Sequence, residues 1–179
     1  MSIAVEQRLP AATWSIDPVH STIGFSVKYL VSKFRTEFER YDATLDTAGE
    51  QPRLVGTVDP TSIRVKDENF HAHLQSPDFF DSERHPQLRF ESTAFRVDGD
   101  ELVVDGELTI KGRTLPVEGR GSLTAVETDP FGNDRVGVQL EAVVDRTAFG
   151  LNWNAELPKG GLALANEAKL DIDLYFVRA

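Results

Sequence analysis

The stretch TIGFSVKYL, residues 22–30, alternates apolar with polar or small side chains along its length. Its apolar positions are Ile23, Phe25, Val27 and Tyr29. A period of two places these side chains on one face of a β-strand and the residues between them on the other. The same alternation recurs in three later segments, 101–110, 135–145 and 170–176. Parallel strands buried on both faces have continuous apolar runs instead, so the pattern predicts an antiparallel sheet with one dry face.

Shorter alternating segments extend this pattern over most of the chain. They are 14–16, 39–45, 54–59, 88–97, 115–120 and 122–127. Short connections with Gly or Pro, typical of hairpins, lie at 97–100, 111–114 and 129–134. The apolar spacing slips within 34–45 and within 88–97, as expected of bulges where a sheet curls. We therefore expect an all-β protein, a single antiparallel barrel of about eight strands.

One segment, DENFHAHLQSPDFFD at residues 67–81, breaks the strand rhythm. Phe70 and Leu74 are four residues apart, and Asp67 or Asn69 can serve as the N-cap of a helix. The following Ser-Pro pair ends a helix, because the residue before proline avoids helical backbone angles. The segment predicts one short helix followed by an aromatic turn.

The composition is that of one ordinary folded domain. Of the 179 residues, 40% are apolar and 27% are charged, which excludes a disordered chain and a coiled coil. A net charge of −10 repels phosphate backbones, so nucleic acid is not an expected partner. The sequence has no cysteine, which excludes disulfides, thiolate metal ligands and cysteine nucleophiles.

The first residues, MSIAVEQRLPAAT, lack the basic start and the apolar run of a signal peptide. No stretch approaches the ~18 consecutive apolar residues of a membrane helix. We therefore expect cytoplasmic residence without stable membrane insertion. The expected organisation is a flexible N-terminus at 1–12 and one barrel domain at 13–179.

The size of the inward side chains decides whether such a barrel is filled or holds a small ligand. Large residues such as Phe25 and Phe90 share the apparent inward register with Gly56, Gly106 and Ala142. Many small positions leave a hollow, but glycines in strands also relieve strain at barrel corners. Periodicity alone leaves both a hydrophobic tunnel and a filled core open.

Catalytic and metal signatures are weak. His71 and His73 lie two residues apart within the expected helix, which directs them to opposite sides and suits one zinc ion poorly. Ser21 directly follows His20, and neighbours on a strand face opposite ways, so adjacency makes no nucleophile–base pair. We expect no catalytic residue and no metal site. The alternative is a small-molecule enzyme on the same barrel in which His73 or His20 acts as general base.

The stretch KYLVSKFRTEFER, residues 28–40, has a local excess of positive charge in an acidic chain. Its cations are Lys28, Lys33, Arg35 and Arg40. They either receive an anionic head group or are solvated charges beside a strand, and both interpretations remain open.

Six motifs, in one order, resemble the YceI-like family. They are TWSIDPVHSTIGFSVKYL (13–30), HLQSPDFFD (73–81), HPQLRFEST (85–93), GELTIKGRTLPV (106–117), DPFGNDRVGV (129–138) and DRTAFGLNWN (145–154). The resemblance extends over nearly the whole chain. It implies a lipocalin-like antiparallel β-barrel that encloses a long polyisoprenoid or isoprenoid quinone, and it implies a homodimer.

From this resemblance we expect non-catalytic binding, storage or transport of a long isoprenoid lipid, a polyprenyl quinone or polyprenyl phosphate, in a hydrophobic tunnel. No cofactor is expected besides this lipid. The alternating register predicts the lining residues Phe25, Val27, Phe90, Leu108, Ile110, Leu140 and Ile172. The expected apolar gate consists of Phe70, Leu74, Phe79 and Phe80.

Two departures from the family's pattern concern the head group. Phe70 and His71 occupy positions where the family usually has Arg and Asp, and Tyr29 occupies the position of a frequent His. Because a pyrophosphate ordinarily needs Arg side chains or a helix N-terminus, we expect a neutral or weakly polar head group such as a quinone. Tyr29, Ser21 or a histidine would donate a hydrogen bond to it at the barrel mouth.

Overall fold

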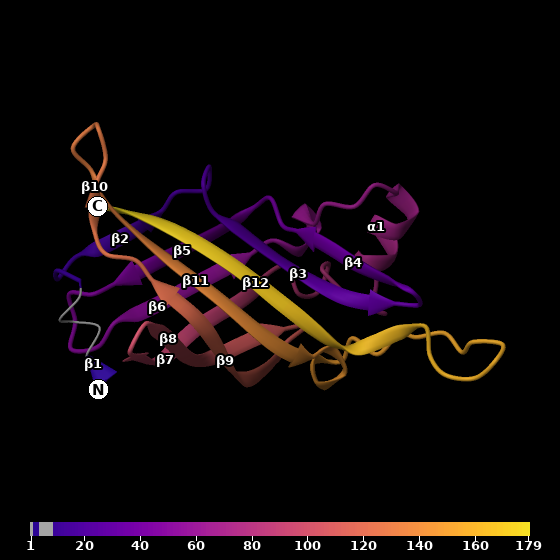
Figure 1. Ribbon diagram of the computed structural model, residues 1–179. Helices are drawn as coiled ribbons and strands as arrows, with labels where there is room; N and C mark the ends of the chain where they lie inside the picture. The colour runs from indigo at the N-terminus through magenta and orange to yellow at the C-terminus, as the bar shows by residue number, and fades with distance from the viewer. Residues whose placement is uncertain (1, 4–8) are drawn as a thin grey trace.

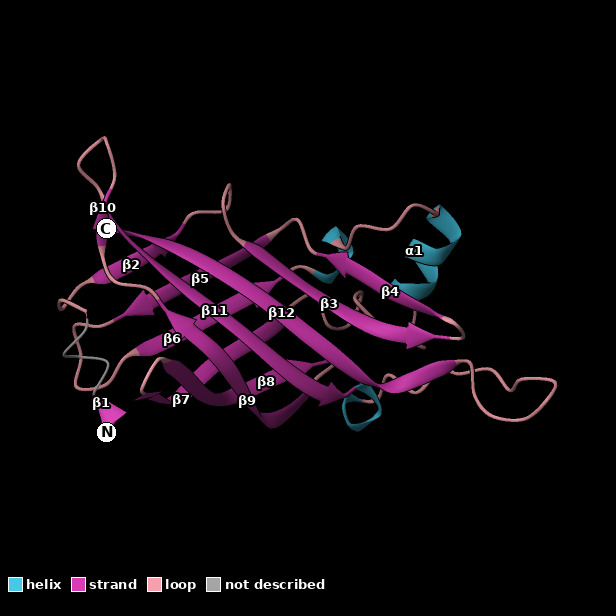
Figure 2. Cartoon of the chain, in the orientation of Figure 1, coloured by secondary structure: helices cyan, strands magenta, loops and turns pink. Residues whose placement is uncertain are grey.

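Long antiparallel strands make up most of the computed structural model, which describes residues 2–3 and 9–179. The strands wind around one axis, with both termini at one end and a helix at the other (Figures 1 and 2). The strands are β1 (Ser2–Ile3), β2 (Thr13–Ile16), β3 (Thr22–Tyr29), β4 (Ser32–Glu37), β5 (Tyr41–Asp46), β6 (Arg53–Val58), β7 (Leu88–Asp98), β8 (Glu101–Ile110), β9 (Arg113–Leu123), β10 (Glu127–Thr128), β11 (Asp134–Asp145) and β12 (Leu164–Arg178). The helical segments are η2 (Pro60–Ser62), α1 (Glu68–Gln75) and η3 (Arg146–Phe149).

Eight strands close into a ring. Each is hydrogen-bonded to the next in the order β11, β9, β8, β7, β6, β5, β2 and β12, and β12 pairs with β11 to complete the circle. Every pairing in the ring is antiparallel. The expected fold, an eight-stranded antiparallel barrel with one short helix, is confirmed.

Strand β12 is long enough to pair with two strands along one of its edges. Its last three paired residues, from Phe176 to Arg178, face β2, whereas the part from Leu164 to Asp173 faces β3. The β3–β4 hairpin therefore extends the barrel wall beyond β2, toward the end that carries α1 (Figure 1). On this side β4 is the last strand of the sheet.

The chain before α1 covers the gap beside β4. Phe38, just after β4, forms a bridge with Ile63. The backbone N–H of Arg64 donates to the carbonyl of Glu37 at 3.0 Å, and the Thr36 hydroxyl donates to the carbonyl of Arg64. These bonds satisfy part of the free edge of β4 and fix the position of the segment that leads into α1.

Helix α1 begins and ends where the sequence predicts. The side chain of Asp67 caps it by accepting a hydrogen bond from the backbone N–H of Phe70 at 2.8 Å. The helix ends before Ser76, which precedes a proline. Leu74 is the one buried residue of the helix, so α1 packs on the barrel through a narrow apolar face.

Three strand predictions need correction. Segments 115–120 and 122–127 were expected as two strands, but β9 contains all of the first and residues 122–123 of the second, without a break between them. Its residue Gly121 pairs directly with Leu140, and a Cβ there would lie only 1.8 Å from the Gln139 carbonyl oxygen. Glycine therefore permits close pairing here and does not mark a turn.

The other two corrections concern the segment 34–45. Strand β4 was not predicted, because the charges of the 28–40 stretch mask its alternation. The spacing slip after Phe38 is a gap between β4 and β5, not a bulge. The slip in β7 is a bulge, between Ser92 and Ala94, as predicted.

Side chains fill the end of the barrel that holds the termini. Trp14, Leu45 and Phe176 are each at most 1% exposed and belong to one apolar cluster. The indole N–H of Trp14 donates to the hydroxyl of Thr47 at 3.0 Å, so this buried polar group is satisfied. The filled core that the sequence left open is therefore present at this end.

Leu9 is also buried in this cluster. Leu9 thus packs with the barrel although it lies four residues before the expected domain boundary at 13, and Ser2 and Ile3 pair with β7. The expected flexible segment, 1–12, falls in part on residues 1 and 4–8, which lie outside the described residues.

Candidate functional site

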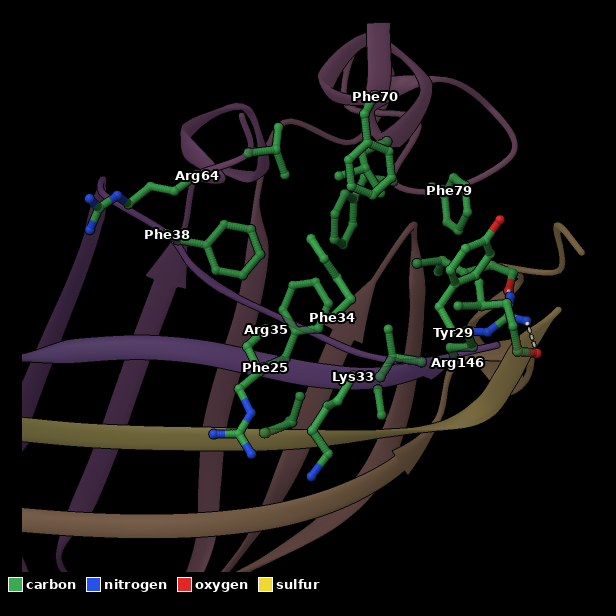
Figure 3. A pocket seen from close by; sticks show the side chains of 18 of the residues that line it. Phe25, Tyr29, Lys33, Phe34, Arg35, Phe38, Arg64, Phe70, Phe79 and Arg146 are labelled. Atoms are coloured by element: carbon green, nitrogen blue, oxygen red, sulfur yellow. Dashed lines mark hydrogen bonds between the residues drawn. The ribbon is translucent and has the colours of Figure 1, made fainter. Parts of the chain in front are cut away.

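A cavity of about 730 Å³ opens at the end of the barrel that carries α1 (Figure 3). Its walls are mostly apolar side chains of β3, of the α1 region, of η3 and of β12. Its volume lies within the roughly 300–1,000 Å³ range of small-molecule sites. We call this space the outer cavity, and its opening beside Tyr29, Ser32 and Phe70 the mouth.

A smaller chamber of about 130 Å³ continues the outer cavity toward the middle of the barrel. Five residues line both spaces: Phe25, Phe38, Leu88, Ile110 and Leu170. We call the smaller space the deep chamber. Beyond it lies the filled cluster around Trp14. The site is therefore a blind pocket that reaches partway along the barrel, not a tunnel through it.

The glycines on the inner face explain why one part is hollow. A Cβ on Gly56 would meet nothing closer than 3.7 Å, and one on Gly119 nothing closer than 3.5 Å, so both positions leave room. A Cβ on Gly106 would lie 2.4 Å from the ring of Phe90, so this glycine makes space for an aromatic side chain. Both roles that the sequence left open for its glycines occur, at different positions.

The structure places all twelve predicted site residues on the walls of these two spaces. The outer cavity is lined by Phe25, Val27, Tyr29, Phe70, Leu74, Phe79, Phe80 and Ile110. The deep chamber is lined by Phe90, Leu108, Leu140 and Ile172, and also by Phe25 and Ile110. Contact of these residues with a ligand stays a prediction.

A chain of aromatic contacts connects β3 with α1 across the outer cavity. The ring centroid of Phe34 lies 6.0 Å from that of Phe25 and 5.2 Å from that of Phe70. Phe38 lies 5.9 Å from Phe25 and 6.0 Å from Phe80. These ring pairs have the separations of favourable aromatic contacts, so they position α1 over the mouth.

Strand alternation did not identify several apolar residues that line the outer cavity: Phe34, Phe38, Val65, Leu88, Val144, Phe149, Leu151, Leu164, Ala168 and Leu170. Polar residues also line it, and they are Ser32, Lys33, Arg35, Arg64, Lys66, Asp67 and Arg146. Val144 and Leu170 continue the alternation of predicted strands and were therefore within reach. Phe34 also alternates, between Lys33 and Arg35, and only an amphipathic interpretation of that stretch would have found it.

Two cations of the basic stretch at 28–40, Lys33 and Arg35, border the outer cavity, but their side chains are directed outward (Figure 3). Lys33 pairs across the hairpin with Lys28, and Arg35 with Ser26, whereas Phe34 pairs with inward-facing Val27. Residues directly opposite on paired strands share a face, so Lys28, Lys33 and Arg35 lie on the outer face. Figure 3 shows the side chains of Lys33 and Arg35 pointing away from Phe34 and Phe70.

Several polar residues line the exposed part of the outer cavity: Tyr29, Ser32, Lys33, Arg35, Arg64, Lys66 and Asp67. The hydroxyl of Ser32 donates to the carbonyl of Tyr29 at 3.0 Å. The hydroxyl of Tyr29, itself a lining residue, forms no hydrogen bond with any other residue in the described part of the chain. Ser21, also expected here, is elsewhere: its hydroxyl accepts from the backbone N–H of Tyr175, away from the cavity.

The two histidines of the enzyme alternative lie apart and do not line the cavity. His73 Nε2 is 3.1 Å from Asp78 Oδ2, and its ring contacts Phe79 and Trp153. His20 Nδ1 is 2.6 Å from Asp17 Oδ2, at the other end of β3. Within residues 2–3 and 9–179, no group of three or more His, Asp or Glu side chains is arranged to hold a metal ion.

Asp17 is held by more than His20. Arg135 donates to Asp17 and to Asp129, at 2.7 Å in each case. Burial raises the pKa of Asp17, but hydrogen bonds from His20, Arg135 and the Val19 backbone outweigh it and lower the pKa to about 2. The Asp17–His20 pair is therefore part of a structural ion cluster, and this carboxylate is a poor proton acceptor near neutral pH.

Arg146 is a buried cation in the wall of the outer cavity. Its guanidinium donates to the carbonyls of Ala165 at 2.7 Å, Trp153 at 3.0 Å and Leu164 at 3.3 Å, and also to that of Leu151. Burial lowers its pKa, and the nearby charge of Asp145 opposes this. Leu151 and Leu164 line the cavity, so Arg146 fixes the wall by joining the segments that carry them.

We predict that Arg146→Lys lowers the free energy of unfolding by about 2–3 kcal/mol, because an ammonium cannot serve all four carbonyls and leaves buried acceptors unpaired. Urea denaturation measures this change. The control is Arg96→Lys, at an exposed ion pair with Asp105, which should change stability by less than about 0.5 kcal/mol. Equal losses in the two variants would contradict the role assigned to Arg146.

No helix in the described ranges is both long and apolar enough to cross a membrane.

Comparisons with known proteins point to one family. A family model described as YceI-like domain matches residues 14–176. A UPF0312 protein of Staphylococcus epidermidis is 30% identical over 170 residues, covering 91% of this chain and 96% of the relative. A UPF0312 protein of Staphylococcus aureus is 29% identical over 168 residues, with the same coverage.

Solved structures have the same fold at low sequence identity. The crystal structure of Burkholderia cenocepacia BcnA matches with a TM-score of 0.76 and 21% identity, over 89% of this chain and 98% of that chain. A polyisoprenoid binding domain from Saccharophagus degradans matches with a TM-score of 0.69 and 14% identity, over 94% and 99%.

Proposed function

This chain belongs to the YceI-like domain family, and from that premise we propose that it binds, stores or transports a long isoprenoid lipid without catalysing a reaction. The tail occupies the deep chamber and the outer cavity, and the head group lies at the mouth. The observation that carries the proposal is the blind apolar pocket, open at one end and closed at the other by the cluster around Trp14.

The energetics of such a site favour a long hydrocarbon. Burying apolar carbon is worth roughly 0.8 kcal/mol per carbon, so a five-carbon isoprene unit contributes about 3–4 kcal/mol before ordering costs. Branched units suit a pocket lined by Phe, Leu, Ile and Val side chains, which present an irregular apolar surface. Several units give firm binding with no polar contact.

Two further observations support a binding role. The structural neighbour from Saccharophagus degradans is described as a polyisoprenoid binding domain. His73 and His20, the candidate general bases, do not line the cavity. No specific observation favours the small-molecule enzyme.

For the head group we propose a neutral or weakly polar group, a quinone, bound through Tyr29. Its hydroxyl lies at the mouth without a hydrogen-bond partner among the described residues and can donate to a quinone carbonyl. The cations of the 28–40 stretch would favour a pyrophosphate, but strand alternation turns Lys33 and Arg35 outward. Residence in the cytoplasm and a homodimer complete the proposal; cell fractionation and light scattering test these two parts.

Protein purified from its native host should release a polyprenyl compound on organic extraction, in a molar ratio near one per chain. Mass spectrometry of the extract identifies it. A parallel extraction of the Leu140→Trp variant controls for lipid carried over from membranes. The proposal fails if the wild-type protein yields no isoprenoid and binds none added to it.

Leu140→Trp should lower the affinity for a long polyprenyl compound by tenfold or more, because the larger ring fills the deep chamber. The affinity for a short isoprenoid alcohol, which fits the outer cavity, should change little. Competition with a fluorescent lipid measures both. The control is Val143→Trp, on the same strand but 62% exposed on the outer face. Equal losses in the two variants, with circular dichroism unchanged, would show that the deep chamber holds no tail.

A polyprenyl quinone should bind more tightly than a polyprenyl pyrophosphate of equal tail length, with an affinity independent of salt. Tyr29→Phe should weaken quinone binding about three- to tenfold, the value of one hydrogen bond, and leave binding of the tail-matched hydrocarbon unchanged. Titration at low and high salt measures these affinities. Tighter pyrophosphate binding that weakens with salt would overturn the assignment of the head group.

A further inference from the structure

Exposed apolar side chains surround the mouth. Leu30 and Val31 form the turn between β3 and β4, and Val31 is fully exposed. Leu162, at 58% exposed, lies in the loop before β12, and the backbone N–H of Leu30 donates to the carbonyl of its neighbour Ala163 at 2.9 Å. Phe70 adds a partly exposed ring from α1. We call Leu30, Val31, Leu162 and Phe70 the rim.

Turn geometry does not explain the choice of Leu30 and Val31. Leu30 has a φ of 52°, in the left-handed region that favours glycine or asparagine. Of the other two-residue turns, the one between β7 and β8 has Gly99 in this conformation, whereas the one between β8 and β9 has the polar Lys111, also at a φ of 52°, followed by Gly112. At the mouth, both residues of the turn are apolar: Leu30 has the strained backbone, and Val31 is fully exposed.

Positive charge surrounds the rim in a chain whose net charge is −10. Lys28, Lys33 and Arg35 lie on the outer face of the hairpin directly behind Leu30 and Val31, and none forms an ion pair with a described residue. Lys159 lies in the same loop as Leu162, and Lys66 at the edge of the mouth.

Acidic residues are also present at this end. Asp67 caps α1, and Glu68 lies in the first turn of α1, where a carboxylate complements the helix dipole. Glu156 pairs with Leu162 through its backbone only, so its carboxylate remains a negative charge in that loop. On the hairpin that carries the Leu30–Val31 turn, the charges without an ion-pair partner among the described residues, Lys28, Lys33 and Arg35, are basic.

We propose that the rim docks the mouth onto an anionic lipid bilayer. Apolar side chains ringed by Lys and Arg enter the interface between head groups and acyl chains, and the cations contact lipid phosphates. Docking in this orientation aims the open end of the pocket at the bilayer, so an isoprenoid tail enters without crossing water. The inference rests on the proposed function for its purpose, but the docking itself does not depend on what the pocket holds.

Charge favours a bilayer over a second copy of this chain. A two-fold contact through the rim places the same patch on both sides, so Lys28, Lys33 and Arg35 of each copy would face like charges. An anionic surface offers the opposite charge across the whole rim. The rim also consists of three separate segments on one end of the barrel, a shape suited to shallow insertion.

The test is sedimentation with phosphatidylcholine vesicles prepared with or without phosphatidylglycerol. The wild-type protein should bind the anionic vesicles, and added salt should weaken this binding. The double variant Leu30→Asn, Val31→Gly should bind at least tenfold more weakly, because it removes two of the four apolar side chains of the rim, including the most exposed one, Val31. Asparagine tolerates the left-handed backbone at position 30 better than leucine does, so the melting temperature should not fall.

The matched control is Phe131→Ser, which removes an apolar side chain that is 87% exposed at the other end of the barrel, in the loop between β10 and β11. It should bind vesicles like the wild type. Equal binding by the wild type and the double variant would overturn the proposal, as would equal binding to neutral and anionic vesicles. A change of mass in light scattering that disappears in the double variant, without vesicle binding, would assign the rim to a second copy instead.

A vesicle-free assay separates this proposal from the function of the pocket. Leu30 and Val31 do not line the cavity, so the double variant should bind a short isoprenoid alcohol in solution like the wild type. Loss of vesicle binding with retained isoprenoid binding supports docking. If neither protein binds the isoprenoid but the wild type alone binds vesicles, the pocket assignment fails and the docking surface remains.

Discussion

Backbone pairing of β12 with β11 on one edge, and with β2 and β3 on the other, closes the sheet and commits every second side chain to one interior. A closed ring has no free edge through which its width could adjust, so the size of the inward side chains decides what is filled. Trp14 and Phe176 fill one end, whereas Gly56 and Gly119 leave space toward the other. The pocket is therefore a property of the wall itself.

The division of one edge of β12 between two strands creates the mouth. Only β2 continues the ring to β5, whereas β3 turns back into β4 and leaves that hairpin without a further strand beside it. The segment through Ile63 and α1 covers this gap with aromatic contacts in place of backbone pairing. Side-chain contacts separate more easily than a β-ladder does, so this is the part of the wall best suited to admit a ligand.

The barrel and its lining were predictable because strand alternation is local and has a fixed period. Phe25, Leu140 and Ile172 each follow from their immediate neighbours in sequence. Three features were not predictable, because they depend on how separate segments of the chain meet. They are the filled end around Trp14, the gap between β4 and β5, and the hydrogen bonds that Arg146 donates to four carbonyls. The outward direction of Lys33 and Arg35 needed only the recognition of β4 as a strand, which their own charges concealed.

Net charge and local charge have different consequences in this molecule. The total of −10 governs long-range repulsion, which salt screens within about 10 Å. The affinity for a docked surface depends instead on the few charges in contact with that surface. Lys33 and Arg35 border the pocket but direct their side chains outward (Figure 3), and Lys28 does not line it, so these cations add little to the binding of whatever the deep chamber encloses. Inside, Arg146 is already engaged by backbone carbonyls. An occupant therefore meets an apolar wall, and its fit depends on the length and branching of its tail more than on its charge.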